Sequence, residues 1–183
     1  VTLSGAARTL TSTSSGAIFF NGTIDGTQDL TVATDGLTTF DGLVGSTTIL
    51  GAIDISGAGG LDLDAAIANT DGSAGAASLD VNGASNLGAN VVTTGAQIYT
   101  GATTVSADIS LKNTNNNVTF SAALDSDGTP RDLTIDTGGN TGTILFSAVV
   151  GQTNDFDVIA ITGNLDLDAD IGTDDFSAAG ATS

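Results

Sequence analysis

One five-residue pattern recurs along the chain: a large apolar residue, any residue, Gly or Ala, any residue, and a second apolar residue. Its clearest copy is Phe-Ser-Ala-Ala-Leu at residues 120–124. The other copies begin at Leu3, Phe20, Phe40, Leu63, Leu87, Val105, Phe146 and Leu167. Successive side chains of a strand point to opposite faces, so residues 120, 122 and 124 would share one face. The pattern therefore predicts a β-strand whose buried row reads large, small, large.

The copies follow one another at a mean spacing of about 20 residues, which is typical of solenoids and other repeat arrays. A helix would need apolar residues at i, i+3, i+4 and i+7, and the copies lack that spacing. A second apolar stretch begins 13 residues after the pattern in three repeats, at Ile53, Leu133 and Ile159. This common offset predicts that the three second strands occupy one equivalent position in the turn.

Repeats that cannot bury an apolar face alone must stack on their neighbours. Short strands joined by Gly and Asn turns favour a parallel β-solenoid of about nine turns, which at about 4.8 Å a turn would be about 43 Å long. The alternative is an antiparallel β-sandwich, whose strands have no reason to repeat one sequence. No linker or change in composition interrupts the chain, so residues 1–183 are predicted to form a single domain.

Composition supports an all-β fold with a polar exterior. There is no Glu and a single Lys, so good helix formers are scarce. The net charge is -18, and the only cations are Arg8, Lys112 and Arg131. Such a surface disfavours binding to nucleic acid and to anionic membranes. It is typical of proteins in salty or calcium-rich water, and it is equally an ordinary solvated exterior that resists aggregation. No apolar run approaches the roughly 18 residues of a membrane span, so membrane insertion is not expected.

Catalysis is limited by what the chain lacks. It has no His, Cys or Glu, which excludes nucleophilic triads, thiol chemistry and histidine-dependent metal sites. The remaining acids include two pairs that share a strand face, Asp62 with Asp64 and Asp166 with Asp168. Some β-helical polysaccharide-cleaving enzymes use Asp clusters, but acids that alternate with Leu are also typical of an ordinary outer face. We therefore expect that the protein is not an enzyme.

Calcium is the one candidate ion, because oxygen-rich loops with several carboxylates are what it requires. Asp125 and Asp127, followed by Gly128, resemble the start of a calcium loop, although no distal Glu completes it. A second site between turns could be formed by Asp166, Asp168 and Asp170, or by Asp174 and Asp175. The competing interpretation is an Asp-Gly turn or a solvated face. No cofactor is expected to be required.

Two further features concern the surface: a row of threonines and the N-terminal strand. Thr9, Thr11 and Thr13 would share a face, as in the flat threonine ladders that order water, but this spacing does not recur in register. The chain also begins directly on a strand-like segment, residues 1–3, without a charged cover. Open terminal turns expose unpaired backbone groups that recruit further strands, so we expect end-to-end pairing with copies of the chain or with neighbouring repeats.

Residues 118–124, Val-Thr-Phe-Ser-Ala-Ala-Leu, and 132–140, Asp-Leu-Thr-Ile-Asp-Thr-Gly-Gly-Asn, resemble the β-strand repeats of large bacterial surface proteins. These include the filamentous-haemagglutinin-like shafts of two-partner-secreted adhesins and the passenger domains of autotransporters. The resemblance implies a secreted, right-handed β-helical shaft that displays or forms an adhesive fibre. The chain has neither the Asn-Pro-Asn-Gly element of the two-partner secretion domain nor an Arg-Gly-Asp sequence.

The sequence thus favours an extracellular or cell-surface structural protein. It would form the shaft of a bacterial adhesin or the self-assembling subunit of an extracellular filament, with surface glycans as candidate ligands. The alternatives are a calcium-dependent carbohydrate-binding module and a polysaccharide-cleaving enzyme.

Overall fold

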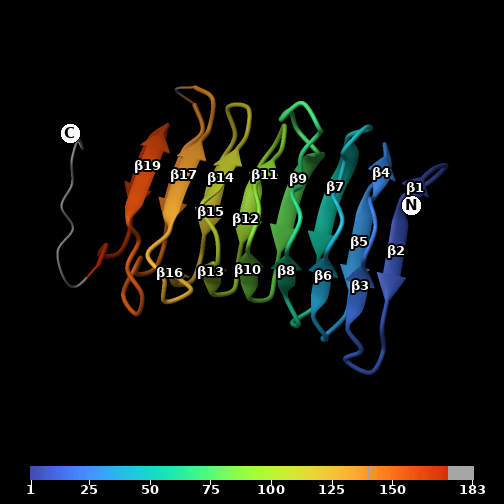
Figure 1. Cartoon of the computed structure of the whole chain (residues 1–183), viewed down its shortest axis with the longest axis horizontal. Helices are drawn as coiled ribbons and strands as arrows, with labels where there is room; N and C mark the ends of the chain where they lie inside the picture. Colours follow the sequence, from blue (N-terminus) through green and yellow to red (C-terminus); the bar gives the residue numbers. More distant parts are fainter. Residues whose placement is uncertain (140, 173–183) are drawn as a thin grey trace.

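The computed structural model describes residues 1–139 and 141–172. All regular structure in that part of the chain is β, and short strands wind into a β-solenoid of about seven turns. The turns are stacked along the long axis of the molecule, from β1 at one end to β19 at the other (Figure 1). Every pairing between named strands is parallel, which confirms the predicted solenoid and not the antiparallel sandwich.

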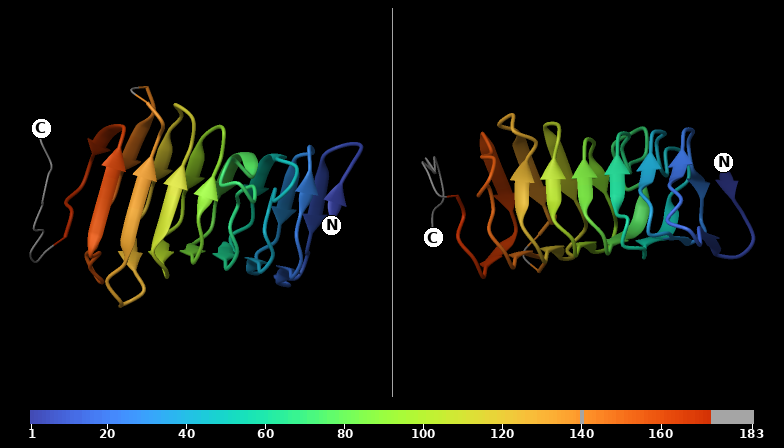
Figure 2. Two further views of the ribbon diagram at one scale, coloured as in Figure 1. Left: turned by 45° about the horizontal axis from the view of Figure 1, so that its top comes forward. Right: turned by 90° about the horizontal axis from the view of Figure 1, so that it is seen from below.

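Two long sheets form two sides of the solenoid (Figure 2). The first sheet has eight strands in the order β2(Arg8–Thr11), β5(Leu30–Ala33), β7(Leu50–Ile55), β9(Ala76–Val81), β12(Gln97–Tyr99), β15(Val118–Phe120), β18(Thr143–Phe146) and β20(Asn164–Leu167). The second sheet has six strands in the order β3(Ile18–Phe20), β6(Thr38–Phe40), β8(Leu61–Leu63), β10(Ser85–Leu87), β13(Thr103–Val105) and β16(Leu124–Ser126). Each sheet takes one strand from each successive turn.

The third side is less regular. It contains the third sheet of the solenoid, which consists of β11(Val91–Val92), β14(Ile109–Lys112), β17(Asp132–Asp136) and β19(Val158–Thr162). Towards the N-terminus the side continues through isolated parallel bridges that join Ile24, Val44, Ile67 and Val91 in turn. The pair β1(Thr2–Leu3) and β4(Asp25–Gly26) completes it.

The recurring pattern is a corner and not a strand, which corrects the prediction of a five-residue strand. Phe120 ends β15 and Leu124 begins β16, so the three residues between them bend the chain from the first sheet to the second. The middle residue is small because the corners of neighbouring turns stack closely. A Cβ on Gly42 would overlap the backbone of Gly22 in the turn before.

The predicted nine turns overcount the solenoid because the pattern occurs at different corners, and the copy at Leu3 ends β1 on the third side. The copies that begin at Phe20 through Val105 end strands of the second sheet, whereas those at Phe120, Phe146 and Leu167 end strands of the first. The same difference between corners explains why only two of the three second strands occupy equivalent positions. Leu133 and Ile159 pair in the third sheet, but Ile53 lies in the first sheet. The offset of 13 residues therefore starts from different corners.

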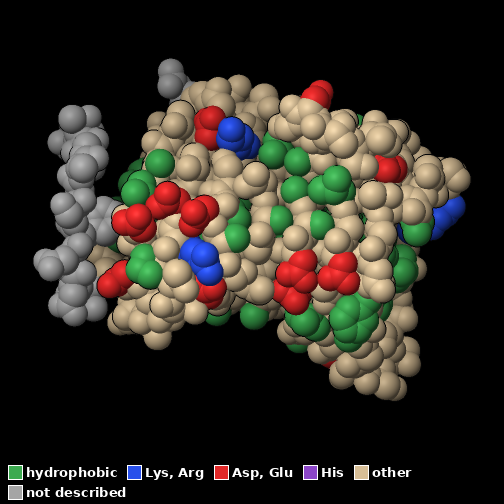
Figure 3. All heavy atoms as spheres, in the orientation of Figure 1, with side chains coloured by type: hydrophobic (Ala, Val, Ile, Leu, Met, Phe, Trp, Pro, Cys, Tyr) green, Lys and Arg blue, Asp and Glu red, His purple; other side chains and the backbone are tan. Residues whose placement is uncertain are grey.

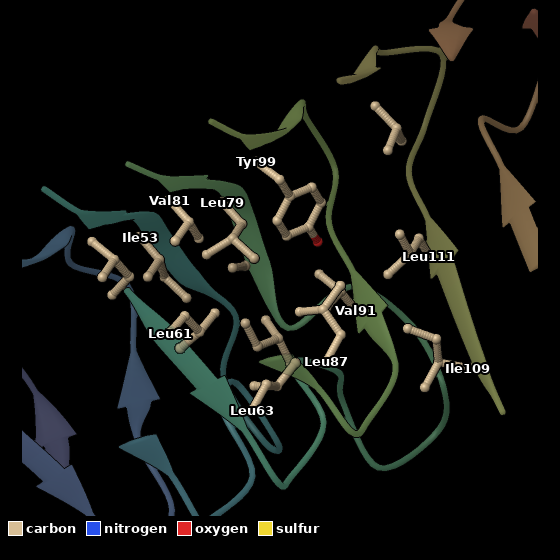
Figure 4. Packing of buried hydrophobic residues seen from close by; sticks show 14 of the residues in the cluster. Ile53, Leu61, Leu63, Leu79, Val81, Leu87, Val91, Tyr99, Ile109 and Leu111 are labelled. Carbon is tan, nitrogen blue, oxygen red and sulfur yellow. The ribbon is translucent and has the colours of Figure 1, made fainter. Parts of the chain in front are cut away.

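The interior is one hydrophobic cluster that extends through the stack (Figure 4). Buried side chains from all three sides meet in it, among them Leu63, Val81 and Val91. Aromatic rings stack on each other along the axis: Tyr99 lies 5.0 Å from Phe120, and Phe120 lies 5.4 Å from Phe146, measured between ring centroids. A solenoid can build such a core with few aromatic residues, because each turn contributes only a few inward side chains.

Candidate functional site

The predicted calcium loop is occupied by protein contacts. Asp125 lies on the outer face of β16, and its Oδ1 accepts a hydrogen bond of 2.9 Å from the backbone N–H of Thr153 in the next turn. Asp127 receives two hydrogen bonds from the Arg131 guanidinium, of 3.0 and 2.7 Å. The hydrogen bonds from Arg131 lower the pKa of Asp127, and the N–H of Thr129 contributes to the same shift. Both carboxylates are therefore already engaged, as ordinary turn residues would be.

The second predicted calcium group lies elsewhere. Asp166 is on β20, beside Leu145 of β18, and Asp168 follows β20 where the chain bends away from the first sheet. Asp174 and Asp175 lie outside the described residues. Within residues 1–139 and 141–172, no group of three or more acidic side chains is arranged to hold a metal ion. Asp125 and Asp127 thus do not meet Asp166 and Asp168 in a shared metal-binding group, and calcium binding stays a prediction.

A carboxylate cluster that the sequence analysis missed lies at the corner after the second sheet. Asp64 and Asp41 occupy the same position of the recurring pattern in adjacent turns, so the stacking brings them together. Burial raises the pKa of Asp64, and the carboxylates of Asp62 and Asp41 raise it further. Asp62 in turn accepts a 2.8 Å hydrogen bond from the side chain of Asn86. The signal was present in the sequence as an Asp at the second position of two consecutive copies.

The outer face of the first sheet holds another like-charged pair. Asp54 of β7 and Asp80 of β9 are directly paired in register, and both point away from the core. Burial raises the pKa of Asp80, and the neighbouring Asp54 carboxylate adds to the shift. In each of the two pairs, Asp54 with Asp80 and Asp41 with Asp64, the two carboxylates repel one another. Among the described residues, neither pair forms a salt bridge with a cation.

Other Asp and Asn side chains act as clips between turns. Asp25 accepts hydrogen bonds from the backbone N–H groups of Thr47 (2.8 Å) and Thr48 (3.2 Å) in the next turn. Burial opposes ionisation of Asp25, but these hydrogen bonds, with others from the side chains of Thr47 and Ser46, outweigh it and lower its pKa. Equivalent clips to backbone N–H groups of the next turn come from Asp29, Asp35, Asn90, Asp108, Asn117 and Asp125. Many of the acids are therefore structural.

The expectation that the threonine spacing does not recur in register is met, because the row that begins at Thr9 holds threonine in only two adjacent strands. Thr9 is paired with Thr31, but the next outward positions of the first sheet are Asp54 and Asp80. Thr13 lies beyond the end of β2. The outer face of this sheet is therefore mixed in chemistry and has no flat row of threonines.

A groove of about 730 Å³ lies at the corner between the third side and the first sheet. We call it the loop groove; it is lined by residues 47–49, 69, 73–74, 92–94, 112–114 and 136. It crosses five consecutive turns, those of Val44, Ile67, Val91, Leu111 and Ile135. At about 4.8 Å a turn, it extends about 19 Å along the axis. None of the predicted calcium ligands lies in it, because no repeated motif marks these loops as neighbours.

A buried polar network supports the floor of the loop groove. The side-chain amide of Gln97, fully buried, donates to the carbonyl of Lys112 (2.8 Å) and to the hydroxyl of Thr93 (3.2 Å). The Tyr99 hydroxyl donates to Gln97 Oε1 at 3.2 Å, and burial raises the pKa of Tyr99. Satisfied buried polar groups of this kind fix the positions of the side chains that bear them.

On the face shown in Figure 3, acidic side chains are scattered over the surface and basic ones are few. No helix in the described part of the chain is long and apolar enough to cross a membrane. Comparison with known proteins gave no match: no family model, no curated protein and no solved structure is detectably similar to this chain. The fold and the surface chemistry are therefore the basis for any functional argument.

Proposed function

We propose that the chain is a stiff structural spacer, a segment of the shaft of an extracellular bacterial surface protein. The observation that carries the proposal is the single hydrophobic cluster that runs through the stack, enclosed by parallel strands on three sides. Each added turn lengthens such a rod by about 4.8 Å without changing its cross-section. Bending the rod would separate turns that share both core contacts and backbone hydrogen bonds, so it resists bending.

The acidic surface is consistent with this role. It keeps a long, strand-rich rod soluble, and like-charged sides of neighbouring rods repel each other. The resemblance of residues 118–124 to the repeats of adhesin shafts supports the extracellular location. Thiol and imidazole chemistry have no residues to act through in this sequence, which holds no His and no Cys.

The two ends of the described stack differ, and this bears on whether copies join end to end. Arg8 occupies an inward row of the first sheet, in register with buried Leu30, and its guanidinium donates to the backbone carbonyls of Ser4 and Ala6. An inward-pointing charge is a common device against edge-to-edge pairing. At the other end, Leu165 and Leu167 of β20 are each 44% exposed. Arg8 is itself exposed and places a charge beside the first strand of this sheet, so end-to-end pairing of copies stays a prediction.

The spacer function can be tested by measuring reach. The chain would be inserted between a surface anchor and a small binding domain, and capture of a ligand-coated bead would be recorded as the gap is widened. A rigid spacer predicts that the maximal gap increases by the length of the rod and shows a sharp limit. The matched control carries Phe120→Asp, which should behave as a flexible linker with a gradual loss of capture. Identical curves for the two would contradict the proposal.

Electron microscopy distinguishes a shaft segment from a filament subunit. Isolated short rods near neutral pH, with calcium present, would support the shaft. Long fibres with a regular axial repeat would instead show that the ends pair and that the protein is itself a filament subunit.

A further inference from the structure

The loop groove is a surface that a spacer does not require. Its floor is aliphatic, formed by the half-buried side chains of Ile49, Ala74 and Val92. Its rim is polar, with Thr48, Asn69, Thr114, Lys112 and Asp136 among the lining residues. A narrow apolar floor bordered by a few polar groups is the usual composition of a ligand site. The groove is open along its length, so it suits an extended ligand and not a compact one.

Lys112 is the informative residue of the rim. It is the only Lys of the chain, and it lies at the position of β14 that pairs with Asp136 of β17. Nevertheless, the one salt bridge in residues 1–139 and 141–172 joins Arg131 to Asp127. The Lys112 ammonium is thus an exposed donor in the groove, while Asp136 offers a carboxylate oxygen beside it. One oxygen of Asp136 accepts from the N–H of Gly138.

Much of the groove backbone is already paired and does not present the continuous free edge that an added strand needs. The N–H groups of Thr47 and Thr48 are bound to Asp25. The N–H of Thr93 donates to Lys112 O, and that of Asn113 donates to Asp136 O, both within the solenoid. A peptide that adds to a sheet edge needs free main-chain donors and acceptors. Recognition in the loop groove therefore falls to side-chain hydroxyl, amide, ammonium and carboxylate groups.

The charge of the site selects among ligands that such groups recognise. The groove carries one positive and one negative side chain, within a molecule of net charge -18. A polyanion would be repelled by the surrounding surface, and the groove offers a single carboxylate to a polycation. An uncharged, polyhydroxylated chain matches both the mixed donors and acceptors of the rim and the aliphatic floor, against which the C–H face of a sugar ring can lie.

We propose that the loop groove binds a linear neutral oligosaccharide along the axis of the solenoid. The aliphatic floor contacts the sugar rings, Lys112 and Asn69 donate to sugar oxygens, and Asp136 accepts from sugar hydroxyls. Thr48 and Thr114 provide hydroxyls at different turns along the groove. This site does not depend on the spacer function, and it needs no metal ion.

The test uses the whole chain and defined probes: linear hexasaccharides of glucose, mannose and N-acetylglucosamine, each titrated while backbone amide resonances are followed by NMR. We expect at least one probe to bind with a Kd of about 1 mM or tighter and to shift resonances of residues 47–49, 92–94 and 112–114. Lys112→Met, which keeps the aliphatic stem, should weaken that binding about tenfold, the effect of one hydrogen bond from a charged donor.

A matched pair of threonine variants provides the control. Thr114→Val removes a hydroxyl from the groove and should weaken binding, whereas Thr119→Val removes one from the outer face of the first sheet and should not. Binding of none of the hexasaccharides would overturn the proposal. So would shifts confined to other surfaces, equal losses in both threonine variants, or preference for a sulfated polysaccharide or an extended peptide. All of these outcomes leave the reach measurement on the spacer unaffected, so the two proposals fail separately.

Discussion

Two kinds of column run along the solenoid and respond to stacking in opposite ways. Inside, the rings of Tyr99, Phe120 and Phe146 lie within 5.4 Å of their neighbours, and each ring covers the next. Outside, the same stacking sets Asp80 beside Asp54, and the charge of one opposes ionisation of the other. Repetition of a residue from turn to turn therefore stabilises an aromatic column and destabilises a carboxylate column.

The clips show how the solenoid uses acids without this penalty. A carboxylate that turns towards the backbone of the next turn, as Asp25 does, meets N–H groups in place of another carboxylate. The N–H groups that the clips bind lie in loops, as with Thr47, or in the first residues of strands, as with Asp132 of β17. The short side chains of Asp and Asn reach the adjacent turn, which gives a structural reason for an acidic chain with no Glu.

The largest effect is expected in the aromatic column. Phe120→Asp places a carboxylate between two rings in a dry core, where an unpaired charge is very costly, so the chain should not fold. The measurement is a thermal melt followed by circular dichroism. Ser121→Asp is the matched control, because Ser121 is the exposed neighbour in the corner, and it should melt cooperatively. A cooperative β melt in Phe120→Asp would refute the stacked core.

A smaller loss is expected when a clip is removed. Asp25→Ala leaves the N–H groups of Thr47 and Thr48 without their acceptor, which should lower the free energy of unfolding by about 2 kcal/mol. Asp25→Asn keeps one acceptor oxygen and should lose less. Because the pKa of Asp25 is lowered, its contribution is present at neutral pH and is lost as the pH falls through that lowered value. Urea denaturation at pH 7 and at acidic pH measures both effects; equal stability of the three proteins at pH 7 would contradict the role of the clip.

At the stacked carboxylates of Asp54 and Asp80, removing a charge is expected to raise the free energy of unfolding. The pKa of Asp80 is raised above its ordinary value of 3.8, so the folded protein holds this proton to a higher pH than the unfolded chain does. The contribution of Asp80 to stability is therefore greatest below the ordinary pKa and falls as the pH rises through the raised pKa. Asp80→Asn should thus stabilise the protein at pH 7 and have little effect near pH 4, as measured by denaturation at both values.

The control for this increase is Asp166→Asn, on the same outer row of the first sheet. Its neighbour in register on β18 is Leu145 and not a carboxylate, so its replacement should not stabilise the protein at pH 7. An equal increase in the free energy of unfolding for the two variants would show that the effect comes from net charge alone. That result would contradict repulsion between the paired carboxylates as its cause.

The smallest effect is expected at the Arg131 ion pair. Both side chains are near the surface, with 26% and 28% of their areas exposed, and exposed pairs of this kind contribute little. Arg131→Met should lower the Tm less than the loss of the Asp25 clip does, and added salt should reduce the difference further. A Tm decrease larger than that of Asp25→Ala would show that this loop contributes more to the stack than its exposure indicates.

The sequence predicted the architecture better than the local geometry. Repeated large apolar residues such as Phe40, Phe120 and Phe146 required an inward column, and the columns required stacked turns. The alternation rule failed within the pattern itself, because the small residue between Phe120 and Leu124 allows a corner as well as an interior strand position. Periodicity alone does not distinguish the two, since both place the flanking apolar side chains in the core.

The loop groove could not be predicted in the same way. Its lining comes from loops of different lengths, such as those that contain Thr48, Ser73 and Thr114, and their alignment depends on the register of the turns below them. Asp125 and Asp127 were selected as calcium ligands by their spacing, but spacing does not reveal that Arg131 or a backbone N–H of the next turn is within reach. The proximity of Asp41 to Asp64 follows from the pattern once its copies are known to stack.

The most direct test of the account is a distance measurement along the axis. The chain has no Cys, so pairs of spin labels can be introduced at chosen sites on the outer row of the first sheet, and their separation measured by pulsed electron resonance. Thr9 and Thr119 are five strands apart, and Thr9 and Leu145 are six strands apart. A stiff stack predicts narrow distributions centred near about 24 and 29 Å between the labelled backbone sites. Broad distributions, or distances that do not increase with the number of turns, would contradict a rigid solenoid spacer.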